Sequence, residues 1–151
     1  MKIEERFLIH APIDQVWSFV RDPRTVAPCV PGCETVEPLS DTAYRSTVAV
    51  SLGPIKARFN VVVQITDEEP PVRLVCVTKG DEGSKASLIS AISEILLVEK
   101  DPQTTEIACS SEVSIVGRLG KFGLGIMKKR ANQLAGEFAA AVQQRMQSVN
   151  A

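Results

Sequence analysis

The sequence predicts an α+β fold in which a curved antiparallel sheet of six to seven strands wraps around a long C-terminal helix. Three observations predict it: a first strand is followed by two short helices, a run of strands joined by short turns comes next, and a long amphipathic helix follows them. Consecutive strands with short turns pair as an antiparallel meander, and a twisted sheet of that many strands curls. The long helix must then cover the concave face of the sheet.

The first predicted elements are a strand and two short helices. Apolar and polar residues alternate over 2–10, which is the period of a half-buried strand. Pro12 suits the first turn of a helix, and apolar residues recur at helical spacing over 12–21. Asp22 ends that helix and can cap a second short helix over 23–29.

Six further strands are expected before the last helix. They span residues 33–39, 43–52, 55–66, 72–79, 86–99 and 104–116. Gly53-Pro54 and Asp101-Pro102 mark tight turns between strands, and residues 80–85 form a polar loop. Apolar and polar residues alternate most regularly over 55–66, as expected for an antiparallel strand with one buried face and one solvent-exposed face.

The last predicted element is a helix over 119–148. Its apolar face repeats every three or four residues and consists of Leu124, Met127, Ala131, Leu134, Phe138, Ala141 and Val142. A long amphipathic helix laid in a curled sheet is the helix-grip architecture. Internal repeats and linkers are absent from the sequence, so residues 1–151 are expected to form a single domain.

Composition and charge narrow the classes of function. The 17 basic and 18 acidic residues give a net charge of -1, so no global field attracts nucleic acid. No apolar run is long enough to span a bilayer, and the N-terminus lacks a signal-peptide core, which favours a cytoplasmic location. The four cysteines are expected as free thiols. None of them forms a zinc-ligand pattern with a second Cys or His pair, so we predict no metal and no cofactor.

The last helix also predicts an apolar cavity beneath it. Large and small residues alternate along its inner face, and the small ones leave volume. A cavity lined by aliphatic side chains stays dry and takes apolar ligands. The expected cavity walls are Phe59, Val61, Val63, Met127, Ala131, Leu134 and Phe138. The alternative is that the alanines let the helix and the sheet pack closely, without a void.

Residues 118–130 contain several cations and no acidic residue, and they predict a cavity mouth that touches a membrane or a partner protein. The candidates are Arg118, Lys121, Phe122, Ile126, Lys128 and Lys129. On a helical wheel Phe122 and Ile126 point away from the apolar face, so an apolar pair would be exposed among cations. Alternatively, the first turn is irregular and both side chains fold into the mouth. Four glycines around the start of this helix favour a flexible entrance.

The residues that could carry catalysis have simpler structural explanations, and no catalytic residue is predicted. His10 falls on the outer side of the first strand. Tyr44 is expected in the core or at the cavity rim, and the alternative is that its hydroxyl donates a hydrogen bond to a ligand carbonyl. Glu94 and Glu112 lie within long strands, where outward-facing glutamates are common. An enzyme would need at least two titratable groups that meet in the cavity.

Several segments of the sequence resemble a known family. They are Val16-Trp17, Arg21-Asp22-Pro23, Ala27-Pro28-Cys29-Val30-Pro31-Gly32-Cys33-Glu34 and Val48-Ala49-Val50-Ser51-Leu52-Gly53-Pro54-Ile55-Lys56-Ala57-Arg58-Phe59. These segments resemble the CoxG family, which is named for a subunit of carbon monoxide dehydrogenase, and the resemblance extends over essentially the whole chain. That family belongs to the SRPBCC superfamily of helix-grip proteins, which includes lipid-transfer START domains, polyketide cyclases and Bet v 1-like plant allergens.

The resemblance implies an accessory protein beside a molybdenum hydroxylase such as carbon monoxide dehydrogenase. Family members look like carriers of a hydrophobic molecule, a lipid or a quinone, that link a cytoplasmic dehydrogenase to the inner face of the membrane. Two other classes stay open. One is a cyclase- or dehydratase-type enzyme of the same superfamily, and the other is an assembly or membrane-recruitment factor that acts through its surface alone.

Overall fold

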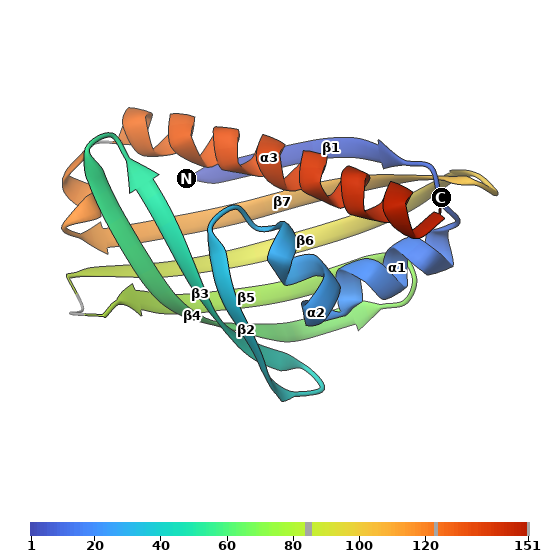
Figure 1. Ribbon diagram of the computed structural model, residues 1–151, viewed down its shortest axis with the longest axis horizontal. Coiled ribbons are helices and arrows are strands. Elements are labelled where there is room, and N and C mark those ends of the chain that lie inside the picture. Colours follow the sequence, from blue (N-terminus) through green and yellow to red (C-terminus); the bar gives the residue numbers. More distant parts are fainter. Residues whose placement is uncertain (84–85, 123, 151) are drawn as a thin grey trace.

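In the part of the chain that the structure describes, seven strands form one antiparallel sheet that curves around the C-terminal helix (Figure 1). The computed structural model describes residues 1–83, 86–122 and 124–150, without the side chains of residues 121, 122, 124 and 148–150. The strands are β1 (Lys2–Ile9), β2 (Cys33–Ser40), β3 (Ala43–Leu52), β4 (Ile55–Glu69), β5 (Arg73–Glu82), β6 (Ser87–Asp101) and β7 (Thr104–Gly117). The helices are α1 (Ile13–Arg21), α2 (Pro23–Val26), α3 (Leu124–Asn150) and the 3-10 turns η1 (Ala27–Cys29) and η2 (Leu119–Phe122). The predicted helix-grip fold is confirmed.

The order of the strands across the sheet is β1-β7-β6-β5-β4-β3-β2. Strands β2 to β7 are neighbours in chain order, as short turns dictate, and β1 joins the far edge by pairing with β7. The α1–α2 segment therefore carries the chain from one edge of the sheet to the other. Figure 1 shows α3 running along the sheet beside β1, with α1 and α2 below its C-terminal end.

The second short helix is interrupted, in contrast to the continuous helix expected over 23–29. It consists of α2 and the η1 turn, because Pro28 has no backbone N–H to continue an α-helical hydrogen-bond ladder. Asp22 caps α2 as expected, since its carboxylate accepts a hydrogen bond from the backbone N–H of Arg24 at 2.9 Å.

The C-terminal helix begins later than the expected 119–148, because the backbone first turns through η2. Gly117 ends β7 with a φ of 97°, a left-handed conformation that glycine adopts without strain. The backbone N–H of Leu119 then donates to the Ser87 hydroxyl at 3.0 Å, which ties η2 to the start of β6. These contacts direct the chain across the end of the sheet before α3 can start.

Strand β5 is longer than predicted. The expected polar loop over 80–85 was wrong for residues 80–82, which belong to the strand. Residues 80–82 belong to β5 because β4 continues alongside them, with Phe59 opposite Glu82 in the antiparallel register. A polar sequence forms a strand here since its partner strand supplies the backbone hydrogen bonds.

Two hydrophobic clusters hold the layers together at opposite ends of the molecule. The first, which we call the α1 core, consists of Phe7, Ile9, Ala11, Val16, Phe19, Val20, Cys29, Leu97, Ile107, Ala139, Val142 and Met146. The second, the hairpin cluster, consists of Leu52, Ala57, Phe59, Val61 and Leu119. The C-terminal half of α3 belongs to the α1 core, while its N-terminal half extends over the middle of the sheet toward the hairpin cluster (Figure 1).

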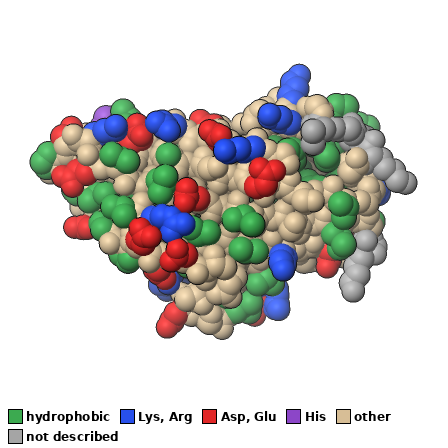
Figure 2. All heavy atoms as spheres, turned by 180° about the vertical axis from the view of Figure 1, so that it is seen from behind, with side chains coloured by type: hydrophobic (Ala, Val, Ile, Leu, Met, Phe, Trp, Pro, Cys, Tyr) green, Lys and Arg blue, Asp and Glu red, His purple; other side chains and the backbone are tan. Residues whose placement is uncertain are grey.

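The molecule seen from behind carries scattered hydrophobic side chains with acidic and basic ones between them (Figure 2). Exposed apolar residues of β6 include Ile92 and Leu96, and the neighbouring Arg73 forms ion pairs with Asp67 at 2.6 Å and Glu94 at 2.9 Å. Exposed apolar residues that are separated by charges are ordinary for a soluble surface.

Candidate functional site

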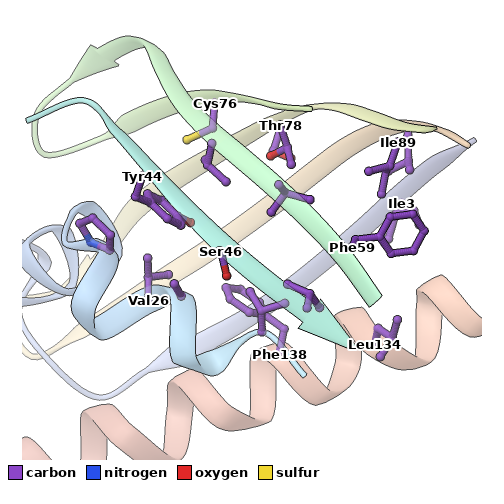
Figure 3. A pocket seen from close by; sticks show the side chains of 18 of the residues that line it. Ile3, Val26, Tyr44, Ser46, Phe59, Cys76, Thr78, Ile89, Leu134 and Phe138 are labelled. Carbon is purple, nitrogen blue, oxygen red and sulfur yellow. The ribbon is translucent and has the colours of Figure 1, made fainter. Parts of the chain in front are cut away.

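A cavity of about 400 Å³ lies between the concave face of the sheet, the α1–α2 segment and the N-terminal half of α3 (Figure 3). This size is within the range of small-molecule binding sites. Most of the lining is apolar and comes from every layer, for example Val26, Val48, Ile65, Ile89, Val113 and Ile115. A dry cavity of this kind favours an apolar occupant, because the occupant removes its own apolar surface and that of the walls from water.

The cavity exists because the C-terminal half of α3 is buried in the α1 core, whereas its N-terminal half contacts the hairpin cluster through Met127 and leaves the middle of the sheet uncovered. Val142 and Met146, in the C-terminal half, are 0% and 2% exposed inside the α1 core. In the N-terminal half the small side chain of Ala131 faces the cavity and leaves the space beneath it open. Ala141, another small residue of the expected apolar face, packs against the α1 core instead. Close packing along the whole helix, the alternative left open by the sequence, is therefore not observed.

The structure brings all seven expected wall residues together around this cavity. Phe59, Val61 and Val63 are successive inward-facing residues of β4, and the first two are buried. Met127, Ala131, Leu134 and Phe138 follow one another on the inner face of α3 at spacings of three and four residues. Figure 3 shows Phe59 and Leu134 at one end of the cavity and Phe138 nearer α2.

Polar side chains on the cavity floor were not identified from the sequence as a group. Tyr44 and Ser46 lie on β3, Cys76 and Thr78 on β5, and Ser93 on β6. In sequence each is a single small polar residue or tyrosine in an alternating strand. Alternation along residues 43–52 predicts that Tyr44 and Ser46 share the face of Val48, Val50 and Leu52. Only the pairing of the strands brings these two side chains together with Cys76, Thr78 and Ser93.

The two titratable groups of the cavity floor are neutral at pH 7. Burial raises the pKa of the Tyr44 phenol above its ordinary value, and the nearby Cys76 and Cys33 raise it further. Burial likewise raises the pKa of the Cys76 thiol to about 11. Neither group is therefore a ready anion, which removes the thiolate that nucleophilic catalysis by cysteine would need.

The charged side chains that line the cavity, among the described residues, are Arg21, Asp41 and Arg130. Arg21 donates to the Glu68 carboxylate at 2.9 Å and to the backbone oxygen of Asp41 at 2.9 Å. Arg130 donates from α3 to the backbone oxygen of Ser51, at the end of β3, at 2.9 Å. Both guanidinium groups therefore connect the walls of the cavity to one another.

The expected mouth residues lie outside the cavity wherever their side chains are described. Ile126 is 56% exposed, and Lys128 and Lys129 are exposed beside it on α3. Arg118 forms an ion pair with Glu82 across the end of the sheet, so it is a structural cation rather than a free one. The side chains of Lys121 and Phe122 lie outside the described residues. From the same segment, Leu119, Met127 and Arg130 line the cavity instead.

The remaining candidates for catalysis do not converge. His10 is exposed, and Glu94 pairs with Arg73 on the outer face of the sheet. Glu112 is exposed and lies 3.2 Å from the N-terminal amino group. All four cysteines are free, and burial raises the pKa of the Cys29 thiol. The described residues contain no group of three or more His, Cys, Asp or Glu that could hold a metal ion.

A curved antiparallel sheet that grips a long C-terminal helix around an apolar cavity defines a START-like protein. The sequence pattern of the CoxG family, named for a subunit of carbon monoxide dehydrogenase, matches residues 6–147, so the chain belongs to that family. The predicted family is thereby confirmed. A search of curated protein sequences finds no match. Among the described residues, no helix has the length and apolar character needed to cross a membrane.

Solved structures support the fold at low sequence identity. A conserved protein from Geobacillus kaustophilus has a TM-score of 0.88 at 18% identity, covering 98% of this chain and 96% of that one. A START superfamily protein from Mycobacterium smegmatis has a TM-score of 0.78 at 13% identity and covers 98% of both chains. The Zhui aromatase/cyclase from Streptomyces sp. R1128 has a TM-score of 0.71 at 16% identity, covering 100% of this chain and 96% of the enzyme. At these identities the likeness establishes the fold alone.

Proposed function

We propose that this protein binds an uncharged hydrophobic molecule, a lipid or a quinone, in the cavity under α3 and carries it without chemical change. The observation that supports this most directly is the cavity itself, which has a volume of about 400 Å³ and an aliphatic lining. Apolar burial contributes roughly 25 cal/mol per Å² of surface removed from water, so such a lining supplies affinity without specific polar contacts. Phe59, Val61, Val63, Met127, Ala131, Leu134 and Phe138 are the proposed ligand-binding walls.

An enzymatic function has less support. The fold is shared with an aromatase/cyclase, but catalysis by acid and base needs two titratable groups aimed at one reacting atom. The titratable groups of the cavity floor are Tyr44 and Cys76, and both are held neutral by burial. A carrier needs no such pair. We therefore favour binding over a cyclase or dehydratase reaction.

Membership of the CoxG family supports a role beside a dehydrogenase complex. We propose that the partner is a molybdenum hydroxylase such as carbon monoxide dehydrogenase, and that the protein works in the cytoplasm. A carrier of this kind would move its ligand between the enzyme and the inner face of the cytoplasmic membrane. Copurification of the enzyme with the tagged carrier from the native host tests the partnership, and an enzyme preparation free of the carrier would count against it.

The start of α3 is the proposed point of membrane contact. Ile126 is 56% exposed and has Lys128 and Lys129 as neighbours, so an apolar side chain is surrounded by cations. Each cation near an anionic bilayer contributes about 1 kcal/mol. Flotation with phosphatidylglycerol vesicles tests this contact through Ile126→Asp. Ile92→Asp is a matched control because Ile92 is 59% exposed on β6, outside the cation-rich segment at the start of α3. Equal flotation of the two variants would remove the membrane proposal.

Ligand binding itself is tested by native mass spectrometry of freshly purified protein. The expected result is a population with the added mass of a hydrophobic molecule that is released by organic solvent. Ala131→Phe, which narrows the cavity, should reduce that population. Protein that carries no added mass, and that also fails to bind a hydrophobic fluorescent probe, would contradict the proposed function.

A further inference from the structure

The floor of the cavity carries two hydroxyl groups in one row across three strands. In the antiparallel registers, Tyr44 of β3 lies opposite Val63 of β4, and Val63 lies opposite Thr78 of β5. Tyr44 and Thr78 therefore flank an apolar residue on the concave face, about two strand spacings, or roughly 10 Å, apart at their Cα atoms. Figure 3 shows both side chains directed into the cavity, with Cys76 beside Thr78.

Other hydroxyls of the cavity floor already have hydrogen-bonding partners. Ser46 donates to the backbone oxygen of Thr35 at 2.8 Å, and the hydroxyls of Ser93 and Ser111 lie 2.7 Å apart. The Tyr44 and Thr78 hydroxyls, in contrast, have no hydrogen-bonding partner among the residues that the structure describes. No fully buried side-chain oxygen or nitrogen of those residues lacks a partner, so both hydroxyls are open to the cavity space. Polar groups in an apolar setting are normally paired, so two accessible donors without a protein partner are available to a ligand that enters the cavity.

The charge state of the cavity defines the chemistry of that ligand. Because burial raises the pKa values of Tyr44 and Cys76, the tyrosine presents a protonated hydroxyl and the cysteine a neutral thiol. The guanidinium groups of Arg21 and Arg130 are engaged with Glu68 and with backbone oxygens. Asp41, the remaining charged residue of the lining, is exposed in the turn between β2 and β3, at the edge of the cavity. Among the described residues, a charged group deep in the cavity would therefore find no free counter-ion on the floor, whereas an uncharged hydrogen-bond acceptor would find two donors.

We propose that Tyr44 and Thr78 form a donor pair that binds a carbonyl oxygen in the middle of an uncharged hydrophobic ligand. This inference rests on the proposed binding function and adds to it the class of molecule that is bound. Both side chains line the concave face of the sheet, so the bound oxygen would lie inside the cavity. The site selects ketone- or quinone-type molecules over pure hydrocarbons and over amphiphiles whose only polar group is charged.

Two fluorescent probes separate this inference from the proposed function. Prodan is a naphthyl ketone whose emission shifts to the red when its carbonyl accepts a hydrogen bond, and diphenylhexatriene is a hydrocarbon of comparable hydrophobicity. We expect Tyr44→Phe and Thr78→Val each to weaken prodan binding about three- to tenfold, the worth of one net hydrogen bond. Each variant should also shift the emission of bound prodan to the blue and leave diphenylhexatriene binding unchanged.

Thr47→Val is the matched control, because Thr47 lies on β3 with its hydroxyl 3.3 Å from Asn60, away from the cavity lining. It should bind both probes as the unchanged protein does. If Tyr44→Phe does not fold, Thr78→Val tests the donor pair alone. Variants that bind prodan with unchanged affinity and emission would overturn the donor pair while leaving the carrier function intact. If the unchanged protein binds neither probe, the proposed function fails, and this inference fails with it.

Discussion

Replacing Ala131 by phenylalanine tests whether the space under α3 is unfilled. Ala131 lines the cavity of about 400 Å³, and a phenyl ring would occupy roughly 100 Å³ of it. Filling a void recovers about 24 cal/mol per Å³, which amounts to at most about 2.4 kcal/mol for this ring. An imperfect fit reduces the gain, so we expect the free energy of unfolding to rise by about 1 kcal/mol.

The matched control is Ala139→Phe on the same helix. Ala139 is 5% exposed within the α1 core, where no cavity receives the ring. Overpacking of a filled core costs about 1–3 kcal/mol. Each kcal/mol shifts the Tm of a chain of this size by about 2–4 °C, so the two variants should move in opposite directions in thermal unfolding followed by circular dichroism. Ala131→Phe should also weaken prodan binding at least tenfold.

Whether Ala131→Phe raises or lowers the Tm shows whether the space beneath Ala131 is empty. If Ala131→Phe lowers the Tm as much as Ala139→Phe does, the space beneath Ala131 is already filled by protein. The physical basis for a carried ligand would then be lost, whatever the family resemblance implies.

Three further predictions concern the elements around the cavity. The hydrogen bond from Arg118 holds the pKa of Glu82 below its ordinary 4.5. The pair therefore stabilises the fold above pH 4.5 and loses this effect as the pH falls through the lowered pKa, so Glu82→Gln should lower the Tm more at pH 7 than at pH 3. Equal Tm losses at the two pH values would count against the ion pair. Arg130→Ala removes the contact between α3 and β3, and stopped-flow fluorescence should show faster probe association and dissociation, with little change in affinity. Arg145→Ala, an exposed change on the same helix, should leave both rates unchanged. Met146→Ala should cost about 2–5 kcal/mol in urea denaturation because Met146 is 2% exposed in the α1 core, yet it should not alter probe affinity. A clear loss of probe binding by folded Met146→Ala would show that the two ends of α3 are coupled.

Much of the fold follows from local pattern. Alternation over β4 identified the inward-facing Phe59, Val61 and Val63, and helical spacing identified Met127 and Leu134 on the inner face of α3. Periodicity succeeds here because each pattern is read within a single element, and the side-chain direction along a strand or helix is set by backbone geometry alone. The predicted start of the last helix and the predicted end of β5 were wrong, because the η2 turn depends on a contact with β6 and the length of β5 depends on pairing with β4.

The sequence by itself determined the order of the elements, the faces that they bury and the family to which the chain belongs. Only the tertiary structure decided that the space under Ala131 stays open, that Arg118 pairs with Glu82, and that the hydroxyls of Tyr44 and Thr78 share one row. The physical reason is that void volume, ion pairing and cross-strand neighbours are set by the register and curvature of the sheet. Those properties arise between segments that lie far apart in the chain.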